Sequence, residues 1–191
     1  IGEMYPTVPL ALFEAVQNAL DGNASRIEVD VNLKAGTVAI RDNGDGVTRS
    51  GLKDALSSVL VSSKTEKGKL GQFGMGLLAL LGKCEYFTFT SCHKSSATDY
   101  SRWTFETESI RAMSDTVTIP VSEVNDLICN SKGKSNQPSK KAVWWRTEVS
   151  GFNISPDKLV GGVDADDIRD GIISRFSLKM LENDASIRIR V

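Results

Sequence analysis

Three polar side chains near the start of the sequence, Glu14, Asn18 and Asp21, have the types and the spacing of a chemical site. On an α-helix, steps of four and three residues keep all three side chains on one face. A carboxylate and a carboxamide are hard oxygen ligands that suit a magnesium-bound phosphate, and the carboxylate can also act as a base. The alternative is a polar face that points into water, which is common for a surface helix.

A second group of polar residues is Asp42-Asn43-Gly44-Asp45-Gly46. It follows a strand-like segment, so Asp42 is expected where the strand ends in a loop. Because Gly44 and Gly46 carry no side chain, a flat ring could lie against the backbone while the Asp42 carboxylate accepts a hydrogen bond from an exocyclic amine. The same five residues also fit an ordinary tight turn.

A third group consists of the glycines Gly71, Gly74 and Gly76, in a loop that precedes an apolar segment. If this segment is a helix, the loop presents free backbone N–H groups and the positive helix end to an anion. The spacing differs from that of the Walker loop, and no βαβ unit precedes it, so dinucleotide binding is disfavoured. We expect residues 62–76 to form a mobile lid.

The segments that must position these groups have clear periodicities. Thr7 and Pro9 predict the start of a helix and Gly22 its end, which places a helix over residues 8–21. Alternation with period two predicts strands, and apolar spacing of three and four residues predicts helices. The expected strands are 26–33, 37–40, 86–90, 102–106, 115–121, 143–152 and 186–191, and the further helices are one capped by Thr48, 75–81 and 164–183.

Helices that are separate from a mostly antiparallel run of strands favour an α+β fold. We expect a two-layer α/β sandwich, in which helices cover one face of a mixed, mostly antiparallel sheet. The 191 residues contain no internal repeat or linker and are enough for one core, so residues 1–191 are predicted to be a single domain. We expect it to be the N-terminal part of a longer protein whose downstream domains are absent from this chain.

Composition disfavours several classes of protein. The formal net charge is −1, so direct nucleic-acid binding by this domain is not indicated. No apolar run is long enough to span a bilayer and no signal peptide is recognisable, so we expect an intracellular, cytoplasmic protein, or a nuclear one in a eukaryote. Cys84, Cys92 and Cys129 lack metal-site spacing and are predicted to be free thiols. His93 is the only histidine, and it follows a strand-like run.

Together with a fourth segment, Trp145-Arg146-Thr147-Glu148-Val149, the three groups resemble the four ordered motifs of the GHKL ATPases, which have the Bergerat nucleotide-binding fold. Arg146 occupies a position at which the fourth motif usually has glycine. The glutamate and the compact glycine loop are more similar to the heat-shock chaperone, MORC, MutL and type II topoisomerase branches than to histidine kinases. Val61-Ser62-Ser63-Lys64 also resembles the Ser-Lys element that precedes the lid in MutL.

The resemblance implies that ATP and Mg²⁺ are the cofactors and gives each matching residue a role. Glu14 is expected to be the general base that activates water and Asn18 to be a magnesium ligand, whereas Asp21 either joins the site or only braces it. Asp42 is expected to bind the adenine amine, assisted by Thr147 through its hydroxyl or a water molecule. The other implied contacts are Gly44 and Gly46 with the base, and Gly71, Gly74, Gly76 and Lys64 with the phosphates, although a loop lysine can also be merely solvated.

Two functions from different classes remain open. The first is an ATPase module that slowly hydrolyses ATP to ADP and phosphate, and whose lid closure couples nucleotide state to homodimerisation or to partner domains. The second is a nucleotide-binding regulatory or scaffold module without significant hydrolysis, because catalysis in this family often depends on a neighbouring domain or chain. A histidine-kinase catalytic domain is a third interpretation, but His93 is not in the helical setting that a phosphoacceptor histidine needs.

Overall fold

The computed structural model describes residues 7–54, 78–96, 100–111, 119–124, 145–155 and 165–191. Its strands form one sheet in the spatial order β5-β4-β3-β6-β2-β1-β7. Every neighbouring pair is antiparallel except β1 and β7, which are parallel. The strands are β1 (Arg26–Asn32), β2 (Thr37–Asp42), β3 (Tyr86–Ser91), β4 (Tyr100–Glu106), β5 (Val121–Val124), β6 (Thr147–Phe152) and β7 (Ser186–Arg190).

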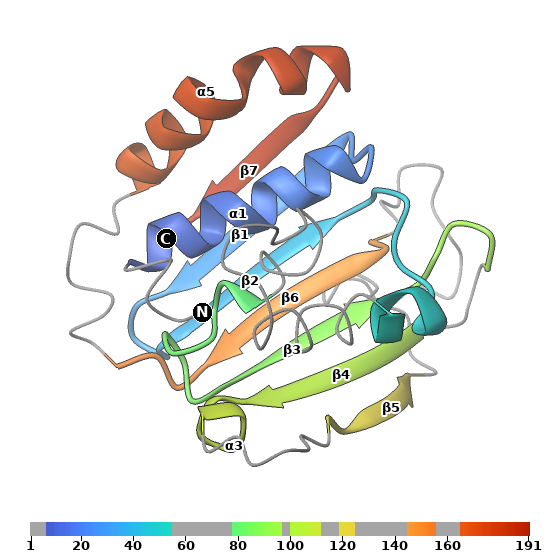
Figure 1. Ribbon diagram of the computed structural model, residues 1–191. Coiled ribbons are helices and arrows are strands. Elements are labelled where there is room, and N and C mark those ends of the chain that lie inside the picture. The colour runs from blue at the N-terminus through green and yellow to red at the C-terminus, as the bar shows by residue number, and fades with distance from the viewer. Residues whose placement is uncertain (1–6, 55–77, 97–99, 112–118, 125–144, 156–164) are drawn as a thin grey trace, which may run out of the picture.

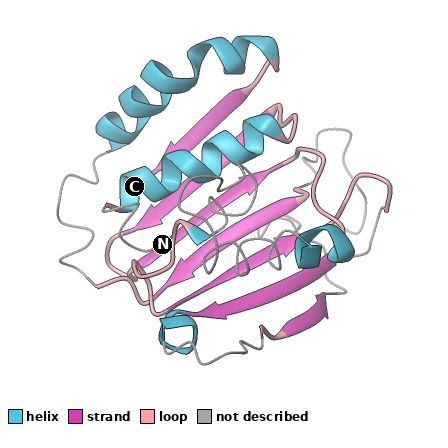
Figure 2. Cartoon of the chain, viewed as in Figure 1, coloured by secondary structure: helices cyan, strands magenta, loops and turns pink. Residues whose placement is uncertain are grey.

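The helices lie on one side of this sheet. α1 (Val8–Asp21) runs along the sheet over β1 and β2, and α5 (Ala165–Glu182) packs beside α1 and against β7 (Figure 1). A short helix, α3 (Thr107–Arg111), follows β4, and residues 49–54 are helical after the Thr48 cap. The two layers are distinct when helices and strands are coloured separately (Figure 2). The predicted two-layer α+β sandwich with a mixed, mostly antiparallel sheet is confirmed.

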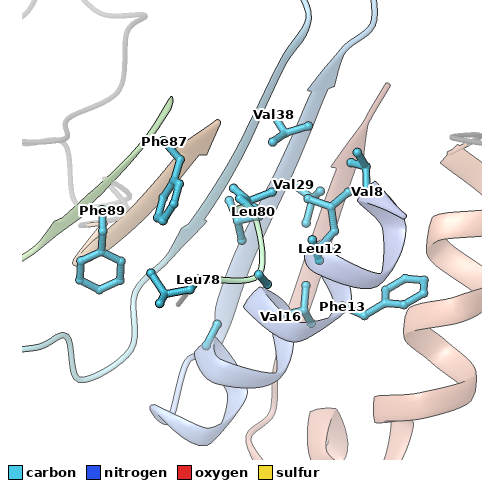
Figure 3. Packing of buried hydrophobic residues seen from close by; sticks show 14 of the residues in the cluster. Val8, Leu12, Phe13, Val16, Val29, Val38, Leu78, Leu80, Phe87 and Phe89 are labelled. Atoms are coloured by element: carbon cyan, nitrogen blue, oxygen red, sulfur yellow. The ribbon is translucent and has the colours of Figure 1, made fainter. Parts of the chain in front are cut away.

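α1 begins and ends where the sequence predicts. The Thr7 hydroxyl accepts a hydrogen bond from Leu10 N at 3.4 Å, and Gly22 N donates to Asn18 O at 2.9 Å at the other end. The apolar face of the helix points at the sheet and at the leucines of residues 78–81 (Figure 3). Burial of each Leu or Val side chain contributes about 1.5–3 kcal/mol. The α1 residues that are at most 1% exposed are Val8, Ala11, Leu12, Val16 and Leu20.

α5 contacts α1 through a glycine. A Cβ atom on Gly171 would lie 2.4 Å from Cζ of Phe13, so the ring fits because residue 171 has no side chain. The Arg175 guanidinium covers the same ring at 4.7 Å from its centroid, a favourable cation–π distance. Ile168 and Ile172 of α5 are fully buried. The apolar spacing that predicted this helix therefore marks the side that packs on the rest of the domain.

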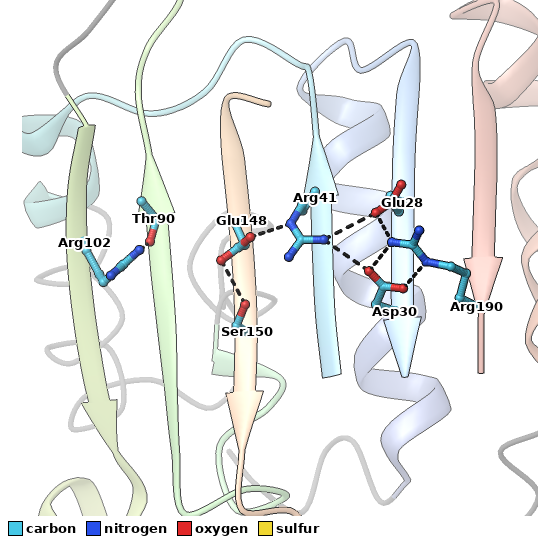
Figure 4. Close-up of polar contacts among 8 residues, drawn as sticks. All are labelled: Glu28, Asp30, Arg41, Thr90, Arg102, Glu148, Ser150 and Arg190. Carbon is cyan, nitrogen blue, oxygen red and sulfur yellow. Dashed lines mark hydrogen bonds and ion pairs between the residues drawn. The ribbon is translucent and has the colours of Figure 1, made fainter. Parts of the chain in front are cut away.

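The opposite face of the sheet carries a network of ion pairs (Figure 4). Arg41 of β2 contacts Glu28 and Asp30 of β1 on one side and Glu148 of β6 on the other. Arg190 of β7 contacts Glu28 and Asp30, and its hydrogen bond is the main cause that lowers the pKa of Asp30. The alternating pattern of β1 therefore separates an apolar face under α1 from a charged face, and Arg190 ties β7 to β1.

Several boundaries differ from those predicted; for example, β2 extends to Asp42 and β4 begins at Tyr100. Of the strand expected at 115–121, residues 115–118 lie outside the described residues, residues 119–120 are not in a strand, and β5 begins at Val121, which pairs with Trp103 of β4. Thr147 begins β6 instead of lying near its middle. Of the helix expected at 75–81, residues 75–77 lie outside the described residues, Leu78 has a 3₁₀ conformation, and the chain then turns so that Leu81 N donates to Leu78 O at 2.9 Å. A buried turn and a helix can bury the same leucines, so apolar spacing does not distinguish them.

Side chains with reactive groups have ordinary structural roles here. Cys84 and Cys92 are buried free thiols, as predicted, whereas Cys129 lies outside the described residues. His93 follows β3 in a turn, where its Nδ1 lies 2.7 Å from Ser95 Oγ.

Among the helices that the structure describes, none has both the length and the apolarity needed to cross a bilayer.

Candidate functional site

Three polar side chains meet at one end of the sheet. Asp42 of β2 is the register partner of Thr147 of β6, and Thr147 is the partner of Ser91 of β3, so the three residues form a row across adjacent strands. They share the face of the sheet on which Val38 and Ile40 enter the core, and they are only 9%, 8% and 1% exposed, respectively. Sequence analysis did not identify Ser91, because its position in the row depends on the pairing of distant strands.

The Asp42 carboxylate is almost completely shielded from water. Burial raises the pKa of Asp42 to about 6, while hydrogen bonds from the Gly44 N–H and the Thr147 hydroxyl oppose this change. The Gly44 N–H donates to Asp42 Oδ1 at 2.9 Å. An ionised carboxylate has about four acceptor positions and no hydrogen, so two donors leave room for one from a ligand. Asp42 can therefore receive an N–H group that enters the site.

The loop after Asp42 packs against backbone on both sides. A Cβ atom on Gly44 would lie 2.5 Å from Gly22 O at the end of α1, and one on Gly46 would lie 2.0 Å from Cys92 O after β3. Gly46 also has a φ of +66°, which other residue types rarely adopt. The prediction that these glycines admit a flat ring is untested, but close contact with α1 and β3 is a second reason for their lack of side chains.

Alanine at Gly46 is expected to destabilise the domain by about 3 kcal/mol or more, because the new methyl group would meet a backbone oxygen and the positive φ would be strained. Urea unfolding of the variant measures this change. Gly51→Ala is the matched control, since a Cβ atom there meets only side-chain atoms of Thr48 and Val47. Equal stability of Gly46→Ala and wild type would contradict the packing that we describe.

Two polar residues of the same loop clamp it to its neighbours. Asn43 Oδ1 accepts hydrogen bonds from the backbone N atoms of Ser25, at 3.0 Å, and Arg26, at 2.8 Å. The Asp45 carboxylate accepts from Lys94 Nζ at 2.9 Å, and this bond is the main cause that lowers the pKa of Asp45. The sequence suggested a turn at these positions, and the structure adds that the turn is tied to the start of β1 and to the connection after β3.

The first predicted group, Glu14, Asn18 and Asp21, lies on α1, whose C-terminal end contacts this loop. Glu14 and Asn18 are partly buried and Asp21 is exposed. Within the described parts of the chain, none of these three side chains has a hydrogen-bond or ion-pair partner. The helix meets the loop at Gly22, where Asp45 N donates to Gly22 O at 2.7 Å. Asn18 and Glu14 therefore lie about one and two helical turns, roughly 6 and 12 Å, from this contact.

The backbone at Arg146 fits between two strands without a glycine. Arg146 N donates to Asp42 O at 2.8 Å, and Arg146 O accepts from Cys92 N at 3.0 Å. Its φ is not positive. The departure from the usual fourth motif therefore leaves the local backbone regular, and the next residue, Thr147, is still the register partner of Asp42.

The predicted phosphate contacts, Lys64, Gly71, Gly74 and Gly76, lie outside the described residues. Among the residues that are described, no three His, Cys, Asp or Glu side chains gather into a group that could hold a metal ion. Asn18 alone could supply only one oxygen ligand to Mg²⁺. This suits a magnesium ion that is held mainly by phosphate and water oxygens, as at many nucleotide sites.

The chain matches the sequence model of a known protein family. A sequence model of the family described as "Histidine kinase-, DNA gyrase B-, and HSP90-like ATPase" matches residues 6–134. The chain belongs to this family, which is the GHKL family that its motifs resemble. A search of curated protein sequences found no match.

Two solved structures of Aquifex aeolicus proteins have a similar fold. The MutL ATPase domain complexed with ADP has 15% identity and a TM-score of 0.51, over 94% of this chain and 57% of that one. The same domain with one mutation has 14% identity and a TM-score of 0.52, over 97% of this chain and 60% of that one. This chain therefore spans less than two thirds of either structure, and the likeness at such low identity concerns the fold.

Proposed function

We propose that this domain binds ATP with Mg²⁺ and slowly hydrolyses it to ADP and phosphate. Membership of an ATPase family supports a nucleotide as the ligand. The observation that carries the proposal is Asp42, a buried carboxylate with uncommitted acceptor capacity beside the C-terminal end of α1. Such a group suits the exocyclic amine of adenine, which has hydrogens to donate.

The base would lie at the Asp42 end of the site. Asp42 would accept from the adenine amine, with Thr147 bonded to the same carboxylate, and Gly44 and Gly46 would leave space for the ring. A base with a carbonyl oxygen in place of the amine would face the carboxylate without a hydrogen between them. This unfavourable contact would select adenine over guanine.

The phosphates would extend along α1, away from its contact with the Asp42 loop. Asn18, whose carboxamide has no hydrogen-bond partner among the described residues, would be a ligand for Mg²⁺, and the bound ion would neutralise phosphate charge. Glu14, one turn further along, would accept a proton from the attacking water. Asp21, which is exposed, would brace the site from its edge.

Lid closure would connect nucleotide state to the surroundings of the domain. Backbone N–H groups of Gly71, Gly74 and Gly76, together with the Lys64 ammonium, would contact the phosphates in the closed lid. A lid that is ordered by phosphate could create a new surface for homodimerisation or for downstream domains. The family resemblance and the glycine spacing support this step.

Isothermal titration calorimetry of the wild-type domain with a nonhydrolysable ATP analogue, with and without Mg²⁺, is the direct test. We expect saturable binding that is tighter with Mg²⁺ and that is not reproduced by the GTP analogue. Light scattering on the same samples reports whether the analogue produces a dimer. Absence of binding by the wild-type domain would contradict the proposed function.

A further inference from the structure

A chain of hydrogen bonds leads from the loop after Gly46 to Thr147, the strand neighbour of Asp42. Val47 N donates to Ser91 Oγ at 2.9 Å, and Ser91 Oγ lies 3.2 Å from Thr147 Oγ1. Thr147 is in turn the register partner of Asp42 on the neighbouring strand, so its hydroxyl lies beside the Asp42 carboxylate, and it lowers the pKa of that carboxyl. Ser91 is 1% exposed, so bulk water offers its hydroxyl no alternative partner.

The ionised carboxylate determines the direction of each bond. Because the carboxylate has no hydrogen, a Thr147 hydroxyl that turns to Asp42 donates its only hydrogen there. Thr147 Oγ1 must then accept from Ser91, and this bond uses the only hydroxyl hydrogen of Ser91. The Val47 N–H donates to the Ser91 oxygen and is the first donor of the chain. Every hydrogen in the chain therefore points toward Asp42.

We propose that Ser91 is a positioning residue for recognition of the adenine amine, which it serves by holding the Thr147 hydroxyl on Asp42 so that the carboxylate remains an oriented acceptor. The inference rests on the proposed nucleotide site. Ser91 acts through Thr147 and does not touch the ligand. Through its hydrogen bond with Val47, Ser91 also joins the loop after Asp42 to the end of β3.

Removal of the Ser91 hydroxyl takes a donor from Thr147 and an acceptor from the Val47 N–H. The Thr147 hydroxyl can then rotate away from Asp42, and the carboxylate loses part of its fixed orientation. In the proposed site the phosphates extend along α1, away from this row of residues. The loss should therefore depend on the amine of the base.

The experiment compares two nucleotides that differ at this amine. ADP and purine riboside diphosphate, which has hydrogen in place of the amine, are titrated by calorimetry into wild-type protein and into Ser91→Ala. We expect Ser91→Ala to bind ADP about 10-fold more weakly and to bind the purine analogue within about 2-fold of wild type. Ser91→Thr, which retains a hydroxyl, should restore most of the ADP affinity.

Ser101→Ala is the matched control, because Ser101 is the β4 register partner of Ser91 and is also buried. It should bind both nucleotides as wild type does. Thermal unfolding checks each variant, and Ser91→Cys, which keeps the shape with a weak donor, takes the place of Ser91→Ala if that variant does not fold. Unchanged ADP affinity, an equal loss for both nucleotides, or the same loss in Ser101→Ala would overturn the role of Ser91. Wild-type protein that binds neither nucleotide would instead contradict the proposed site itself.

Discussion

Asp42→Asn is expected to make the ligand-free domain more stable at pH 8 and to weaken binding of an ATP analogue by at least about 100-fold. The Gly44 N–H donates to Oδ1, so the asparagine must keep its oxygen there and turn its NH₂ group toward the remaining positions. An NH₂ group facing the adenine amine offers a donor to a donor. Calorimetry of the variant measures the loss, and undiminished binding would remove Asp42 from the site.

The expected gain in stability follows from the pKa of Asp42. A pKa of about 6, against an ordinary value of 3.8, means that folding favours the protonated carboxyl, and the difference corresponds to about 3 kcal/mol. The contribution is fully present below pH 4 and is lost as the pH rises through 6. Asparagine resembles the protonated form at every pH. The stability difference between variant and wild type should therefore grow from pH 4 to pH 7 and then level off.

Urea unfolding of both proteins at a series of pH values tests this dependence. The comparison cancels the other titrating groups, including Asp30, whose pKa is lowered and whose contribution is lost at lower pH. A variant whose advantage over wild type does not change with pH would show that Asp42 is not a buried carboxylate. In that case the ionisation of Asp42 would not explain the stability of the variant, and any loss of nucleotide binding would need a separate explanation.

Glu14→Ala is expected to retain nucleotide affinity within about 3-fold and to lower turnover by roughly 100-fold or more, which is the usual contribution of a general base. The Glu14 side chain is partly buried and uncommitted among the described residues, so its loss should leave the fold of α1 intact. Phosphate release under single-turnover conditions, with the domain in excess over ATP, gives the rate. Full hydrolysis by this variant would assign the base to another group.

Gln17→Ala serves as the control for Glu14, because Gln17 is an exposed residue on the same helix. Its rate and affinity should match those of wild type. Tight nucleotide binding without any phosphate release by wild-type protein at high concentration would favour the alternative, a regulatory or scaffold module without hydrolysis. In that case Glu14→Ala would change neither measurement.

Several elements could be predicted from the sequence because they depend on consecutive residues. A helix or a strand that buries one face repeats apolar residues at its own period, and for this reason α1, β1 and α5 lie where the spacing indicates. The Asp42 segment was also predicted to end a strand, which the structure confirms. The predicted roles of Lys64, Gly71, Gly74 and Gly76 remain predictions.

The tertiary structure alone decided how distant segments meet. Ser91 and Thr147 are 56 residues apart in sequence, and only the pairing of β3 with β6 places one hydroxyl beside the other. Likewise, Gly44 packs against Gly22 because the Asp42 loop returns to the end of α1. By itself, the sequence determined which residue types are available for an adenine nucleotide and on which local elements they lie. The row that orients Asp42 arises from strand register, since hydrogen bonds between strands depend on the fold and not on local spacing.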